Sequence, residues 1–190
     1  MKTMVRAIGI DDAPFHFRDR DVLVIGSLVR APNYLEGILS TRVKVDGNEA
    51  TDKLIKVIND SRFSQQAKAI FVDGAALGGF NIVDLRSLWG STGIPAISVS
   101  REEPNMDSIQ DALKQHLPDW EDRLRKIDMG DIHKISTEHN PIYIRIEGID
   151  LEEAKRLLQL FTIRGRLPEP IRISHIIASG VVRGESRGRA

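Results

Sequence analysis

The order of strand-like and helix-like segments is the feature that most constrains this chain. Three strand-like runs follow one another, at residues 5–10, 22–29 and 37–45. Short connections between successive strands favour antiparallel neighbours. After residue 50, helical and strand-like segments alternate, which favours parallel strands joined by right-handed crossovers. The order predicts an α/β fold: a mixed sheet of three antiparallel strands followed by parallel strands, flanked by helices.

The segments after residue 50 are recognised by their periodicity. Apolar residues at helical spacing predict helices, the second of them capped by Asn81, and short apolar runs predict buried strands. The expected helices lie at 50–61, 81–90, 107–117, 119–127, 151–161 and 170–182, and the expected strands at 69–72, 95–99, 132–136 and 142–146.

Composition narrows the range of functions. A chain of 190 residues fits one domain, residues 1–190, and its 27 basic and 27 acidic residues exclude a large uniform basic field. Nucleic-acid affinity would therefore come from a local patch. The absence of Cys excludes disulfides, thiolate nucleophiles and Fe–S clusters. There is no apolar run long enough to cross a membrane and no signal-peptide pattern, so a cytoplasmic protein is expected.

Acidic residues stand at or just after several of the expected strands. Asp11 and Asp12 follow the first strand, Asp46 the third and Asp73 the fourth. Carboxylates held by different strands can converge on one hard cation such as Mg²⁺. The alternative is ordinary turn chemistry, because Asp-Gly, present at 46–47 and 73–74, is a frequent turn dipeptide.

The Gly-rich segment 74–81 lies between an expected strand and an expected helix. Backbone N–H groups at such a place can bind phosphate, which would suit a nucleotide or another small molecule. The segment lacks the Walker and dinucleotide patterns, and the alternative is a tight strand-to-helix crossover.

The C-terminal segment 162–190 differs from the rest in charge. It holds six Arg and two Glu, a net charge of +4. Arginine binds phosphate oxygens in pairs, so the segment could follow a nucleic-acid backbone, and the alternative is a solvated tail. His175 lies on the last expected helix, where either a structural or a chemical role is open. The five His residues show no zinc-ligand spacing.

Four motifs together resemble one family. They are IGIDDAPF at 8–15, VDGNEAT at 45–51, GFNIVD at 79–84 and GESRGRA at 184–190. They resemble the mainly archaeal endonuclease dU family, formerly a family of unknown function, over essentially the whole chain. That family is distantly similar to endonuclease V, a repair nuclease for deaminated bases with a ribonuclease-H-like fold.

The resemblance implies roles for named residues. It makes Asp11 and Asp73 catalytic metal ligands, with Asp46 or Asp12 as the third carboxylate, and places Arg101 on the scissile phosphate. Segment 32–42 is similar to the wedge that separates the strands beside a damaged base, with Tyr34 as its stacking side chain. The residues implied to contact nucleic acid are Tyr34, Arg42, Arg172, His175 and Arg187.

Two positions depart from endonuclease V. Val43 stands where that family has a catalytic Glu, and His175 where it has an Asp. The expected function is a Mg²⁺- or Mn²⁺-dependent endonuclease acting in DNA repair on strands that contain deoxyuridine or hypoxanthine. The alternative is a catalytically inactive ribonuclease-H-like module that binds nucleic acid or a protein. The sequence indicates no oligomeric state.

Overall fold

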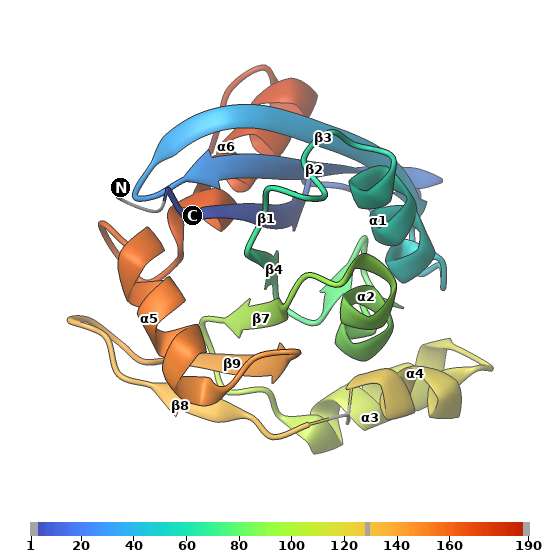
Figure 1. The fold of residues 1–190 in the computed structure, drawn as a ribbon. Coiled ribbons are helices and arrows are strands. Elements are labelled where there is room, and N and C mark those ends of the chain that lie inside the picture. The colour runs from blue at the N-terminus through green and yellow to red at the C-terminus, as the bar shows by residue number, and fades with distance from the viewer. Residues whose placement is uncertain (1–3, 128–129, 188–190) are drawn as a thin grey trace.

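The computed structural model describes residues 4–127 and 130–187 and contains the predicted mixed sheet. Seven strands lie in the order β3-β2-β1-β4-β7-β9-β8, and neighbouring strands are hydrogen-bonded (Figure 1). Strands β1, β4 and β7 are parallel, and the others join the sheet in antiparallel pairs. The strands are β1 Arg6–Asp12, β2 Asp21–Arg30, β3 Tyr34–Lys44, β4 Ala69–Asp73, β7 Ala96–Ser100, β8 His133–Ile135 and β9 Ile142–Glu147.

Helices cover both faces of this sheet. Helices α1 and α2 pack on one face, and α5 and α6 on the other (Figure 1). The helices are α1 Ala50–Asn59, α2 Leu85–Thr92, α3 Met106–His116, α4 Trp120–Ile127, α5 Leu151–Phe161 and α6 Glu169–Arg183. No helix within 4–127 and 130–187 is long and apolar enough to cross a membrane.

The prediction that Asn81 caps the second helix is wrong. Asn81 belongs to a short hairpin of β5 (Ala76–Leu77) and β6 (Asn81–Ile82), and Asp84 caps α2 by accepting a hydrogen bond from the Ser87 N–H. The buried Asn81 side chain instead accepts from the Ala50 N–H at 2.8 Å. Asn81 therefore satisfies the start of α1, which is distant in sequence.

Alternation along the strands separates two cores. Ile8 and Ile10 face α1 and α2, whereas Ala7 packs against the α5 and α6 side. Because successive side chains of a strand point to opposite faces, Gly9 and Asp11 share the α6 face with Ala7. Asp11 therefore lies on the α6 face, whereas the next residue, Asp12, points toward the α1 and α2 face.

Helix α6 lies directly on the backbone of β1 and β2. A Cβ at Gly9 would stand 2.1 Å from the carbonyl carbon of Pro170, so only glycine fits there. The Ser27 hydroxyl donates to the Pro170 carbonyl at 2.7 Å, and the Ser174 hydroxyl donates to the Gly9 carbonyl at 2.8 Å. This close contact brings the next residue of α6, His175, over the end of β1.

Candidate active site

Two carboxylates, the buried Asp11 and the partly buried Asp73, lie side by side at the carboxyl ends of parallel strands. Ile10 of β1 is in register with Val72 of β4, so the next residues, Asp11 and Asp73, are neighbours on adjacent strands. Both point to the α6 face, and Asp11 is only 4% exposed. Adjacent strands are about 4.8 Å apart, which is close enough for both carboxylates to act on one ligand.

His175 of α6 is hydrogen-bonded to the Asp11 carboxylate. Its Nδ1 lies 2.8 Å from one Asp11 oxygen, while the other oxygen accepts from the Asp12 N–H at 2.8 Å. The hydrogen bond to Asp11 raises the pKa of His175, against the opposing effect of burial. Its Nε2 is buried and has no hydrogen-bonding partner among the described residues. One donor or acceptor of the site is therefore left over for a ligand or a water.

The site holds more negative charge than its own residues neutralise. Burial raises the pKa of Asp73 to about 6, and the charge of Asp11 adds to the effect while Arg101 opposes it. Burial likewise raises the pKa of Asp12 to about 6, against a hydrogen bond from the Gly78 N–H. Carboxylates in this condition gain stability when a further positive charge arrives.

Arg101 follows β7 and faces Asp73. Its guanidinium lies 3.4 Å from an Asp73 oxygen, and its own carbonyl accepts from the Arg166 guanidinium at 2.9 Å. An open pocket of about 450 Å³ lies beside this pair and is lined also by Ser100, Glu102 and Arg145. The pocket gives a ligand access to Asp73 and Arg101 from solvent.

The donors suit a hard divalent cation. Oxygen ligands are what Mg²⁺ prefers, and proteins usually supply only one or two carboxylates while water and substrate phosphates complete the shell. Within 4–127 and 130–187, no three His, Asp or Glu side chains are grouped as a ready metal site. Asp11 and Asp73 are the two carboxylates that could contribute to such a shell, and burial with the charge of Asp11 raises the pKa of Asp73.

Asp46 does not join this cluster. It lies in the turn after β3 with φ at 54°, and its carboxylate accepts from the Phe80 N–H at 2.9 Å. The charges that act most strongly on Asp12 and Asp73 come from Asp11, His175 and Arg101. Asp46 holds the Gly-rich segment in place, which is the turn role that the sequence left open.

The Gly-rich segment uses its N–H groups internally. The Gly78 N–H donates to Asp12 at 2.5 Å and the Phe80 N–H to Asp46. Because these donors already serve two carboxylates, they are not offered to a phosphate. The structure thus favours a crossover over a nucleotide site in this segment.

Val43 lies on the other face of the sheet from Asp11. It is fully buried in the core with Ile8 and Ile10, beside α1. Asp12 follows Ile10 onto this same face, and both Asp12 and Val43 adjoin Gly78. Asp46 also contacts Gly78, because its N–H donates to the Gly78 carbonyl, so both candidates for the third carboxylate lie beside it. Of the two, Asp12 is the one whose charge acts on Asp73.

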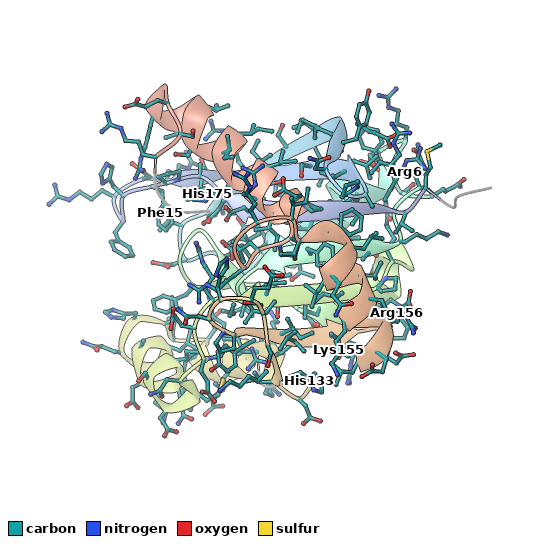
Figure 2. The ribbon with its side chains drawn as sticks, turned by 90° about the vertical axis from the view of Figure 1, so that its left-hand side faces the viewer. Arg6, Phe15, His133, Lys155, Arg156 and His175 are labelled. Carbon is teal, nitrogen blue, oxygen red and sulfur yellow. The ribbon has the colours of Figure 1, made fainter. Side chains whose placement is uncertain are left out.

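Tyr34 lies at the opposite end of β1 from the carboxylates. Tyr34 pairs with Arg30, and Arg30 pairs with Arg6 of β1. Because Arg6 and Asp11 are five residues apart on that strand, Tyr34 lies about 17 Å from Asp11 along the strand direction. Figure 2 labels Arg6, the first residue of β1, and Phe15, which follows the strand, at opposite sides of the molecule. The ring is 60% exposed, packs under the Arg30 guanidinium at 4.5 Å, and borders an open pocket of about 400 Å³.

The arginines implied to contact nucleic acid are spread over the α6 face. Arg42 is exposed on β3 opposite Leu23, about 12 Å from Asp11 by strand spacing. Arg172 forms two hydrogen bonds of 2.7 Å with the buried Glu169, and Arg187 pairs with Glu185. The two Glu of segment 162–190, already counted in its net charge of +4, are thus the partners of Arg172 and Arg187. Arg189 lies outside the described residues.

Sequence reasoning missed the residues that assemble this site. Gly9, Ser27, Ser174 and Pro170 seat α6 on the sheet, and Arg166 fixes the backbone of Arg101. The only available signal was a glycine inside an apolar strand, which marks a close backbone approach.

The chain matches a family model along nearly its whole length. Residues 3–182 match the model described as Endonuclease dU. A UPF0215 protein of Methanothermobacter thermautotrophicus is 44% identical over 192 residues, which covers 100% of this chain and 94% of the relative. A crystal structure of a protein from Archaeoglobus fulgidus is 39% identical, with a TM-score of 0.86 over 93% of this chain and 98% of that one.

The fold is shared more widely. Endonuclease V of Ciona intestinalis, in complex with a 24mer DNA containing an inosine followed by a ribo-adenosine, superposes with a TM-score of 0.62. The match covers 95% of this chain and 87% of that chain at 16% identity. At this identity the likeness establishes the architecture, which is ribonuclease-H-like as the sequence predicted.

Proposed function

Because the chain belongs to the endonuclease dU family, we propose that it is a metal-dependent endonuclease that hydrolyses phosphodiester bonds in DNA close to a deaminated base. The observation that supports this most is the pairing of Asp11 and Asp73 on adjacent parallel strands, with Arg101 and His175 around them. The family and the fold support a nuclease, and the cation, the lesion and the repair role are part of the proposal.

Each side chain has a task in this proposal. Asp11 and Asp73 would hold Mg²⁺ or Mn²⁺. Asp12 is proposed as the third carboxylate through its charge, which acts on Asp73 although its side chain leaves β1 on the opposite face. When bound, the cation supplies positive charge to the oxygens of the phosphate. Arg101 donates to the same phosphate from the open pocket, because its guanidinium presents several N–H groups at once. His175 fixes the orientation of the Asp11 carboxylate.

DNA is the proposed substrate, and its path crosses the α6 face. Arg42 lies on that face and can contact the backbone to one side of the carboxylates, while Arg172, His175 and Arg187 are carried by α6 or follow it. Tyr34, about 17 Å away along β1, is proposed to stack beside the damaged base. A base so far from the carboxylates means that cleavage occurs some nucleotides away from the lesion.

A cleavage assay tests the proposal. Labelled duplex and single-stranded oligonucleotides carrying one deoxyuridine, one hypoxanthine or neither are incubated with Mg²⁺, Mn²⁺ or EDTA. We expect metal-dependent nicking of the lesion strand. Asp73→Asn should lower its rate at least ~100-fold, since it removes a metal ligand. The matched control is Asp60→Asn, which changes a carboxylate that is 64% exposed and paired with Lys56, and it should cut normally.

Cleavage that continues in EDTA, or that survives Asp73→Asn, overturns the assignment of the carboxylates. If all oligonucleotides are nicked equally, with or without a lesion, the protein is still a nuclease but the proposed preference for a deaminated base is wrong.

A second function is favoured by one observation. Val43 is wholly buried where endonuclease V has its catalytic Glu, so the site has one carboxylate fewer on that strand. A ribonuclease-H-like module that only binds nucleic acid or a protein does not cut it, so it would need no other carboxylate in place of the missing Glu. Binding that persists in EDTA, with no cleavage of any oligonucleotide, would identify this module.

A further inference from the structure

The loop between β1 and β2 follows directly after Asp12 and carries two aromatic side chains, the exposed Phe17 and the partly buried Phe15. It leaves the sheet at Asp12 and returns at Asp21. Phe17 is 81% exposed, more than any other large apolar side chain in 4–127 and 130–187. Its ring meets the edge of Phe15 at a centroid distance of 6.0 Å and an interplanar angle of 80°. Phe15 is partly buried against the core, so it supports Phe17 from below.

The loop holds this ring out on a defined turn. The His16 N–H donates to the Asp19 carboxylate at 2.8 Å, and the Asp19 N–H donates to the His16 carbonyl at 2.8 Å. The Ala13 N–H continues the sheet by donating to the Leu23 carbonyl. Hydrogen bonds between its own polar groups therefore hold the turn in place, and the Phe17 side chain takes no part in them.

Basic and acidic residues alternate beside the ring, with Arg18 and Arg20 followed by Asp19 and the exposed Asp21, respectively. Arg18 and Arg20 flank the turn tip, and neither forms an ion pair among the described residues. Asp19, the acidic residue between them, has its carboxylate engaged by the His16 N–H. An exposed aromatic face between unpaired cations is the arrangement that single-stranded nucleic acids bind, because bases stack while phosphates meet the cations.

We propose that Phe17, supported by Phe15, stacks on an unpaired nucleobase next to the phosphate at the carboxylate site. The inference rests on the proposed function and adds to it a second contact with the substrate. Phe17 belongs to the loop at the carboxyl end of β1, where the carboxylates lie, whereas Tyr34 lies at the other end of that strand. The occupant is a DNA strand that is locally single-stranded at the point of cleavage.

Binding of a labelled single-stranded oligonucleotide in EDTA tests this without cleavage. Loss of one stacked base weakens binding about 5- to 150-fold, so Phe17→Ala should raise Kd by that factor. Phe17→Tyr keeps the ring and should bind within about 3-fold of the unchanged protein. The matched control, Leu160→Ala, removes an apolar side chain that is 40% exposed on α5 and should leave Kd unchanged.

A fluorescent adenine analogue at successive positions of the oligonucleotide gives an independent readout. Its emission should be quenched at one position by the unchanged protein and by Phe17→Tyr, and not by Phe17→Ala. If the unchanged protein cuts DNA and Phe17→Ala binds equally tightly, the stacking contact is refuted and the nuclease remains. If the unchanged protein neither binds nor cuts, both proposals fall. If Phe17→Ala instead dissolves a dimer seen by sedimentation, the ring contacts a second copy and the nucleobase is refuted.

Discussion

Replacing Asp73 by Asn should make the metal-free protein more stable at neutral pH while it destroys the proposed site. Burial and the neighbouring Asp11 raise the pKa of Asp73 to about 6 from its ordinary value of 3.8. The native state therefore keeps this proton up to about pH 6, whereas the unfolded chain releases it near 3.8. The stability that the proton contributes is complete below 3.8 and is lost as the pH rises through about 6.

The magnitude follows from the two pKa values. At about 1.36 kcal/mol per pH unit, the charged Asp73 carboxylate lowers the free energy of unfolding by about 3 kcal/mol above pH 6. Asparagine is close to Asp in shape and is neutral at every pH, so Asp73→Asn removes this cost. For a chain of 190 residues, at about 2–4 °C per kcal/mol, Tm should rise by about 6–12 °C as an upper limit.

Thermal unfolding in EDTA at a series of pH values measures this effect. The gap between Asp73→Asn and the unchanged protein should be largest near about pH 8 and should nearly vanish near about pH 4, where Asp73 is protonated in both states. Asp60→Asn, at an exposed carboxylate, should shift Tm little at any pH. A variant that is less stable than the unchanged protein at about pH 8 would refute the reasoning, since it would mean that the charged carboxylate is well accommodated without a cation.

Three further outcomes are expected. Gly9→Ala places a Cβ 2.1 Å from Pro170 and should lower the free energy of unfolding by about 3 kcal/mol or more in denaturant titration, whereas Gly90→Ala, in open space on α2, should raise it by about 0.5–1 kcal/mol. Asp11→Asn should lower the pKa of His175, followed by NMR, because it replaces the charged acceptor that raises this pKa by a neutral one; an unchanged titration would contradict the contact. Added Mg²⁺ should raise Tm more at about pH 8 than at about pH 5, and should leave Asp11→Asn unmoved at both.

The order of elements was readable from the sequence because it depends on local periodicity. The three antiparallel strands, the later alternation and the amphipathic stripe of α5 all follow from the spacing of apolar side chains. The end of β3 was also marked locally, since the Asp46-Gly47 dipeptide forms the turn that follows it. The cap of α2 was misplaced because Asn81 and Asp84 are both good capping residues and only the hairpin of β5 and β6 decides between them.

The sequence also supplied four candidate carboxylates, at Asp11, Asp12, Asp46 and Asp73. The family resemblance pointed to Asp11 and Asp73, and the pairing of β1 with β4, which the structure shows, makes them neighbours. Motif resemblance supplied Arg101 and the family, because these depend on residue identity along the chain.

Tertiary structure alone decided what surrounds those carboxylates. Helix α6 is far from β1 in sequence. Its close packing against the Gly9 backbone brings His175 to Asp11. The choice between Asp12 and Asp46 likewise depends on how the Gly-rich segment folds back over the sheet, where Asp46 takes the Phe80 N–H. Local spacing fixes which face of a strand a side chain occupies, but packing between distant segments fixes which partner it meets there.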